Sequence, residues 1–180
     1  MLNELKEVNE ANFVPKDLLA KIQANIPIFC VDIVPVKYND VGRLSFGLIL
    51  RDTPDLGNRW CFIGGRLRLD EAISAAADRE LNSALGDSLQ RDDEFKLEHI
   101  LIEYSRERRQ GYPYDLRQHA ISATIPILMS GDGIAQGDEA KDFKWWLADE
   151  LDGEIMGFGQ ERLVGRERAQ SDTIRVVNPA

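Results

Sequence analysis

The feature that most constrains the fold of this chain is an acidic residue on the apolar side of a helix-forming segment, residues 71–85. At 100° per residue, the apolar side chains form one broad stripe, made of Ile73, Ala76, Ala77, Leu81, Ala84 and Leu85. Glu80 falls in the middle of this stripe, so we expect its carboxylate to face the body of the protein. Because an unpaired buried carboxylate is strongly destabilising, a cation, a metal ion or hydrogen-bond donors should meet it. A structural pair with an arginine and a functional site fit this pattern equally well.

The residues around Glu80 keep a fixed spacing. Five residues separate Gly65 from Glu71, seven separate Glu71 from the pair Arg79-Glu80, and Gly86 follows the segment. This spacing resembles the Nudix box, G-x5-E-x7-R-E-U-x-E-E-x-G-U with U apolar, and the chain is similar to the Nudix hydrolase superfamily. The resemblance implies that Gly65, Glu71, Arg79 and Gly86 are structural residues of the box, which support its loop and helix.

The box is degenerate at its end. Ser83 and Ala84 stand at the positions of its last two glutamates, and Asp87 stands at the last apolar position. Such boxes normally gather carboxylates around a divalent metal ion. The resemblance therefore implies a metal site that has lost two of its carboxylates.

The alternation of strand-like and helix-like segments predicts a mixed α and β fold. Together with the resemblance, it implies an α+β Nudix fold, a mixed β-sheet flanked by helices in an α/β/α sandwich. Strands are expected near 27–36, 44–51, 60–63, 95–105, 119–129 and 142–147, and helices after Pro15, over 71–85 and near 148–152 and 160–170. Asp70 is the expected cap of the central helix. We divide the chain into an N-terminal helical extension, 1–26, a Nudix domain, 27–172, and a C-terminal tail, 173–180.

Outside the box, the chain is most similar to the GDP-mannose mannosyl hydrolase branch of the superfamily. The matching patterns are Pro27 to Asp32, Arg51 nine residues before Trp60, the run Trp60-Cys61-Phe62-Ile63-Gly64-Gly65-Arg66, and Asp142-Phe143-Lys144-Trp145. Enzymes of this branch hydrolyse a nucleotide sugar at the anomeric carbon and release GDP. Most other Nudix enzymes attack a phosphorus atom of a nucleoside diphosphate derivative.

The resemblance assigns roles to six residues. Arg51 and Glu80 are the expected catalytic residues, and Asp32, Arg51 and His119 the expected substrate-binding residues. Magnesium or manganese would be held by the Gly64 carbonyl, Glu80 and Glu139, an oxygen-rich set that suits these ions. The alternative for Arg51 is a solvated charge at a strand end, and for His119 a structural histidine.

The chain also departs from the pattern of this branch in a late loop. There the branch has a Gln-His pair, which supplies a metal ligand and the general base. Glu139-Ala140 stands there, so the expected base is missing. Two functions therefore compete. One is hydrolysis of a nucleotide sugar or another nucleoside diphosphate derivative; the other is a catalytically impaired protein that binds a nucleotide or a protein partner without turnover.

Composition narrows the partners. A net charge of −9 over 180 residues argues against nucleic acid as a ligand, because proteins that bind nucleic acid attract it with a positive electrostatic field. Cys30 and Cys61 lie in apolar runs and predict reduced core thiols of a cytoplasmic protein. We expect neither a signal peptide nor a membrane span, and a nucleoside diphosphate-type small molecule as the ligand. A homodimer is an alternative that the sequence leaves open.

Overall fold

A computed structural model describes residues 14–92, 100–109 and 112–164. Its core is an eight-stranded mixed sheet around β1 (Ile28–Tyr38), which pairs in parallel with β7 (Ala120–Ser130). The other strand pairs are antiparallel, and the remaining strands are β2 (Leu44–Thr53), β3 (Gly57–Cys61), β4 (Ile63–Arg66), β5 (Gln90–Arg91), β6 (Ile100–Tyr104) and β8 (Asp142–Leu147). This architecture confirms the expected mixed sheet with flanking helices. The predicted end of the domain at residue 172 lies outside the described residues.

Both faces of β1 are buried because its side chains alternate between two apolar clusters. Val31 and Ile33 pack with the central helix α2 (Ile73–Leu85). Val34 and Val36 pack on the other face with Leu163 and Val164 of the short helix α3 (Glu161–Val164). Asp32 falls between Val31 and Ile33 and therefore points to the face opposite α2.

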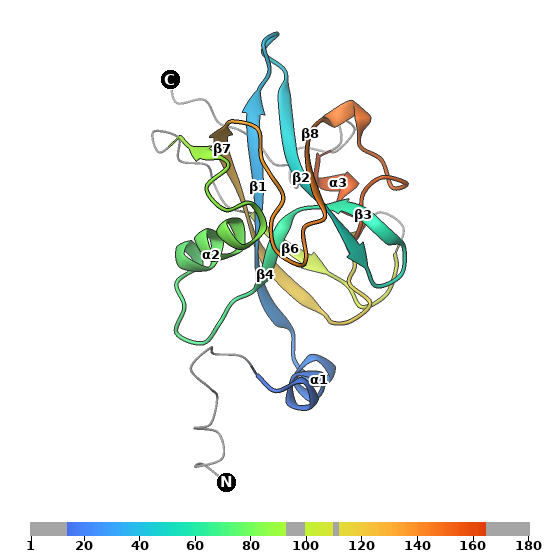
Figure 1. Ribbon diagram of the computed structural model, residues 1–180. Coiled ribbons are helices and arrows are strands. Elements are labelled where there is room, and N and C mark those ends of the chain that lie inside the picture. The colour runs from blue at the N-terminus through green and yellow to red at the C-terminus, as the bar shows by residue number, and fades with distance from the viewer. Residues whose placement is uncertain (1–13, 93–99, 110–111, 165–180) are drawn as a thin grey trace.

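The helices differ in how they are attached. Figure 1 shows α2 beside β1 and β4, whereas α1 (Lys16–Asn25) stands at one end of the sheet and buries none of its residues. A short 3-10 helix, η2 (Ala148–Glu150), follows β8, near the expected late helical segment. Within the described part of the chain, no helix is long and apolar enough to cross a membrane. Cys30 and Cys61 are free and buried, as expected.

The ends of α2 test the capping prediction. Gly86 follows the helix with φ of 55°, a conformation that glycine adopts without strain, so the predicted end is confirmed. The prediction that Asp70 caps the helix is wrong. Ala72 is the cap residue and offers no side-chain hydrogen bond, while Asp70 lies in a turn with φ of 59°. Asp70 stands two residues before this cap residue, and the helix start has no side-chain cap hydrogen bond.

Candidate functional site

Glu80 lies where the apolar stripe predicted it. Its side chain is 14% exposed, and its carboxylate lies against the backbone of Gly65, where any side chain would collide with it. The inward orientation of Glu80 is therefore confirmed. A guanidinium meets it, because Arg79 Nη1 donates to Glu80 Oε1.

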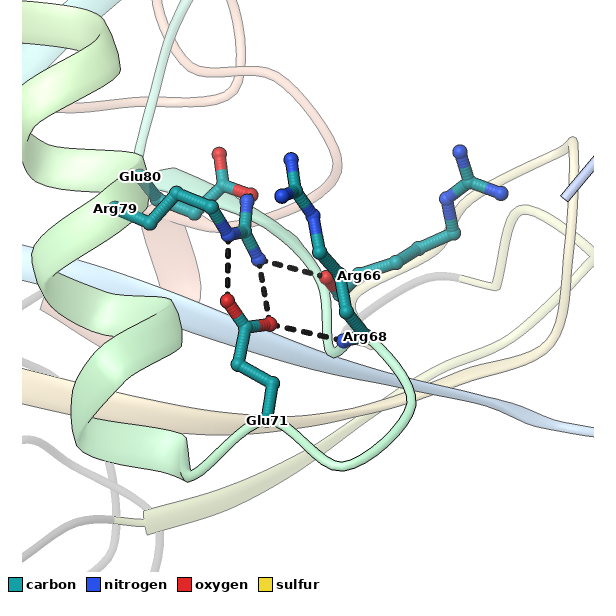
Figure 2. Close-up of polar contacts among 5 residues, drawn as sticks. All are labelled: Arg66, Arg68, Glu71, Arg79 and Glu80. Atoms are coloured by element: carbon teal, nitrogen blue, oxygen red, sulfur yellow. Dashed lines mark hydrogen bonds and ion pairs between the residues drawn. The ribbon is translucent and has the colours of Figure 1, made fainter. Parts of the chain in front are cut away.

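Arg79 also ties the box loop to the helix (Figure 2). Its Nε and Nη2 donate to the two oxygens of Glu71 at 2.6 and 2.8 Å, and Nη2 reaches the Arg66 carbonyl at 3.2 Å. The Arg68 backbone N–H donates to the same Glu71 carboxylate at 2.9 Å. Hydrogen bonds from Arg79 lower the pKa of Glu71 to about 2, although burial opposes the shift. The frame of the box thus forms one charge-paired network.

The three expected metal-binding residues come together. Gly64, Glu80 and Glu139 border a hollow of about 10 Å³, together with Ile49, Ile63, Ser83 and Ala84. This is room for roughly one water molecule. Both carboxylates already have cationic partners, since Glu80 pairs with Arg79 and Glu139 with Arg51. With both carboxylates paired in this way, the residues as arranged do not fit a resident metal ion. Among the described residues, no group of three or more histidine, cysteine, aspartate or glutamate side chains could hold one.

A cleft of about 1040 Å³ adjoins this hollow. Asp32, Arg51, Gly64, Glu80 and Glu139 all line it, so the fold gathers five of the six residues predicted to bind substrate or metal. The glycines matter here because they leave β4 without side chains at two positions. Glu80 reaches Gly65 from the α2 face, and Asp32 lies over Gly64 from the opposite face.

His119 is the exception, because it is not among the residues that line the cleft. Its Nε2 lies 3.0 Å from Glu103 Oε1, and its side chain is 37% exposed. This is an exposed pair between neighbouring strands. A role for His119 in substrate binding stays a prediction.

Arg51 is held at the wall of the cleft. Its side chain is 14% exposed and forms an ion pair with Glu139, and its guanidinium carbon lies 5.7 Å from the centre of the Phe158 ring. Its Nε is buried and has no hydrogen-bond partner among the described residues. The guanidinium therefore keeps donor capacity that its present partners do not use.

A second arginine, which the sequence analysis missed, faces the same ring. The guanidinium carbon of Arg117 lies 5.5 Å from the centre of Phe158 and is fixed by two 2.9 Å hydrogen bonds to the buried Asp115. The Asp-x-Arg spacing, two residues before His119, was the available signal. All three residues line the cleft.

Asp32 is the most perturbed carboxylate of the cleft. Burial raises its pKa to about 6, and the nearby charge of Glu80 acts in the same direction. The charge of Arg51 and the hydroxyl of Tyr104, which donates to Asp32 Oδ2 at 3.1 Å, oppose the shift. The hydroxyl of Ser122 also favours the ionised form, although it has no hydrogen bond of good geometry.

The chain was compared with known protein families, curated proteins and solved structures. The profile of a family described as a domain of unknown function (DUF4916) matches residues 9–170. No curated protein matches the sequence significantly.

Solved structures share the fold. A possible asymmetric diadenosine tetraphosphate (Ap4A) hydrolase from Jonesia denitrificans is 25% identical, with a TM-score of 0.64 over 78% of this chain and 91% of its own. The Nudix domain of Shewanella oneidensis NrtR, complexed with ADP ribose, is 20% identical, with a TM-score of 0.56 over 86% and 90%. A bifunctional NMN adenylyltransferase/ADP ribose pyrophosphatase from Francisella tularensis, complexed with AMP and a manganese ion, is 22% identical, with a TM-score of 0.53 over 72% and 36%. These similarities confirm the Nudix fold.

Proposed function

Since the chain belongs to the DUF4916 family and has the Nudix fold, we propose that it binds a nucleoside diphosphate derivative in the cleft and hydrolyses it. The observation that carries this proposal is the cleft, where arginines lie beside a glycine-lined backbone and the Nudix helix. Two of the similar structures are described as a possible Ap4A hydrolase and as a domain bound to ADP ribose. The flanking patterns around Asp32 and Arg51 add GDP-mannose and other nucleotide sugars as candidates.

The charges of the cleft suit a diphosphate. Five arginines line it: Arg51, Arg66, Arg68, Arg79 and Arg117. Among the described residues, the side chain of Arg66 has no hydrogen-bond or ion-pair partner. Figure 2 shows that Arg66 and Arg68 extend away from Glu71, whereas Arg79 points to it. Guanidinium groups bind phosphate oxygens through paired hydrogen bonds, so Arg51 and Arg66 are the proposed diphosphate contacts.

In this proposal, Glu139 occupies the phosphate-binding position on Arg51 until a ligand arrives. Its carboxylate pairs with Arg51, but the Glu139 side chain is 55% exposed. Water can therefore solvate this carboxylate when the ion pair breaks, so breaking the pair costs little free energy. A phosphate group carries more charge and more acceptor oxygens than the carboxylate. The ligand therefore displaces Glu139 from Arg51.

Hydrolysis needs a bond from the water oxygen to phosphorus or to the anomeric carbon, loss of the bond from that atom to a phosphate oxygen, and release of a proton from the attacking water to the solvent. Negative charge then collects on the leaving phosphate. Arg51 and Arg66 stabilise this charge in the transition state. The two points of attack give different products, which are two phosphorylated fragments or a free sugar and a nucleoside diphosphate.

Binding without turnover is the second candidate. It is favoured by the pairing of Glu80 and Glu139 with arginines, and by Ala84 and Ala140, which are buried and have no polar side chain. In this case the protein would report on or carry the nucleotide.

The test is a panel of ADP-ribose, GDP-mannose and Ap4A, each with and without magnesium or manganese. Calorimetry measures binding, and chromatography separates sugar release from cleavage between phosphates. Product formation that Arg51→Ala abolishes supports hydrolysis, and binding without product supports the second candidate. Arg59→Ala is the matched control, because Arg59 lies opposite Arg51 on β3 but does not line the cleft. Absence of binding to every compound would refute the proposed function.

A further inference from the structure

Asp32 ends a chain of hydrogen bonds that crosses the buried side of the cleft. The Phe62 backbone N–H donates to Gln160 Oε1 at 3.0 Å, Gln160 Nε2 donates to the Tyr104 hydroxyl at 3.0 Å, and this hydroxyl donates to Asp32 Oδ2 at 3.1 Å. Tyr104, Gln160 and Phe62 are each at most 5% exposed. These hydrogen bonds join β6, the segment before α3 and Phe62, the residue just before β4.

The direction of this chain is fixed. A backbone N–H can only donate, so the atom of Gln160 that faces Phe62 must be its oxygen. The amide nitrogen must then face Tyr104, and because it donates, the tyrosine hydrogen is left to point at Asp32. Asp32 Oδ2 is thereby held as an acceptor. Its other oxygen, Oδ1, lies over Gly64, where β4 has no side chain to cover it.

We propose that Tyr104 and Gln160 are positioning residues, which hold Asp32 as an acceptor for a hydroxyl group of the ligand. The cleft would then select nucleoside diphosphates that carry a second sugar. This inference rests on the proposed function and names its substrate class. Tyr104 and Gln160 also line the cleft, and the role proposed for them is exerted through Asp32.

The charges of Arg51 and Asp32 determine which part of the ligand binds beside each residue. Arg51 offers only donors and attracts phosphate, whereas an ionised Asp32 offers only acceptors and repels it. Both line the same cleft and lie close enough for the charge of Arg51 to lower the pKa of Asp32. The diphosphate therefore binds at Arg51, and a neutral group with a hydrogen to donate binds at Asp32. A sugar hydroxyl satisfies this requirement and a further phosphate does not.

The experiment compares compounds with and without the second sugar. Affinities for ADP-ribose and ADP, and for GDP-mannose and GDP, are measured by calorimetry without divalent metal. In Asp32→Asn, the chain keeps the amide oxygen toward Tyr104 and turns the NH2 group to the cleft, so a donor replaces an acceptor. We expect about tenfold weaker binding of the sugar compound, and unchanged or tighter binding of the plain diphosphate.

Tyr104→Phe tests the positioning role itself. It should lower the affinity for the sugar compound by about threefold to tenfold and change the affinity for the plain diphosphate by no more than about twofold. Tyr114→Phe is the matched control, because the buried Tyr114 also bonds a carboxylate, Asp55 at 3.2 Å, but does not line the cleft. The double variant Asp32→Asn/Tyr104→Phe should bind the sugar compound better than Asp32→Asn alone, because its amide is free to turn.

The outcomes separate the two proposals. If wild type binds neither these four compounds nor Ap4A, with or without divalent metal, the proposed function fails, and this inference fails with it. If wild type binds only Ap4A, the proposed function stands and this inference is overturned. If wild type binds both members of a pair and the variants weaken them equally, only the role of Tyr104, Gln160 and Asp32 is overturned. Thermal unfolding checks each variant. If Tyr104→Phe does not fold, the selective loss in Asp32→Asn decides the question, since Asn keeps an acceptor for Tyr104.

Discussion

Glu71 and Asp32 are both tied to β4, Glu71 through Arg79 and the Arg66 carbonyl and Asp32 as the register partner of Gly64, yet the protein treats their charges in opposite ways. Hydrogen bonds from Arg79 lower the pKa of Glu71 to about 2, whereas burial raises the pKa of Asp32 to about 6. The first carboxylate stabilises the fold as an anion. The second is ionised at neutral pH at a cost in stability, and groups kept at such a cost often mark functional sites.

The largest expected effect on stability comes from removing the stabilising carboxylate, Glu71. Glu71→Gln removes the charge that binds Arg79 and should lower the free energy of unfolding at pH 7 by about 2–4 kcal/mol. Because the folded pKa is depressed, this stability is present above the unfolded value of 4.5 and is lost as pH falls through about 2. Urea unfolding between pH 2 and 7 measures it.

Glu103→Gln is the control for this prediction, since Glu103 pairs with His119 but is 72% exposed. It should change the free energy of unfolding by less than about 1 kcal/mol. Equal losses in the two variants would show that the network of Glu71 is no more than a surface pair.

Arg51 belongs to the cleft side of the comparison, and its removal should affect affinity. Arg51→Ala should weaken binding of a nucleoside diphosphate compound by about 1.5–3 kcal/mol, the scale of hydrogen bonds to charged groups. Arg51→Lys should restore only part of this loss, because an ammonium lacks the planar fork. Calorimetry measures the affinities. An unchanged affinity in Arg51→Ala would contradict the placement of the diphosphate.

Asp32→Asn should raise the free energy of unfolding, the opposite of the effect expected for Glu71→Gln. The folded pKa lies above the unfolded value of 3.8, so the folded protein loses stability as pH rises from about 4 through about 6. The variant lacks this loss and should be more stable by about 1–2 kcal/mol at pH 7, with no advantage below about pH 4. Urea unfolding at both values checks this. A variant less stable than wild type at pH 7 would mean that ionised Asp32 is not costly.

The smallest effect is expected for metal. Free protein should bind magnesium or manganese weakly, because both carboxylates of the hollow have arginine partners. Ala84→Glu adds a carboxylate one helical turn after Glu80 and should tighten manganese binding severalfold. Ala84 is buried, so the variant should also lose stability. Calorimetry with thermal unfolding tests both; a folded variant with unchanged metal affinity would contradict the alignment of Ala84 with a metal-binding glutamate.

Local patterns in the sequence predicted local structure well. Helical periodicity was enough to place α2, turn Glu80 inward and end the helix at Gly86, because these depend on neighbours within a few turns. The same reasoning misplaced the helix cap at Asp70. Capping depends on backbone angles in the preceding turn, which the residue type alone does not set.

The partners of the site residues could not be predicted in the same way. Arg51 and Glu139 belong to β2 and a late loop, and Tyr104 reaches Asp32 because β6 and β1 both pair with β7. These contacts follow from strand register, which no local pattern reports. The sequence therefore left open whether an arginine would pair with Glu80, and it did not show that Arg51 would pair with Glu139.

The parallel pairing of β1 with β7 has a consequence for how the molecule acquires its shape. Nine register pairs join Ile28–Val36 to Ala120–Leu128, segments separated by most of the domain. The central strand therefore cannot complete its hydrogen bonds during synthesis until the chain through about residue 128 has left the ribosome. Such non-local pairing slows folding and leaves hydrophobic edges exposed in the meantime. Truncated chains that end before β7 should accordingly aggregate, whatever the intrinsic stability of α2.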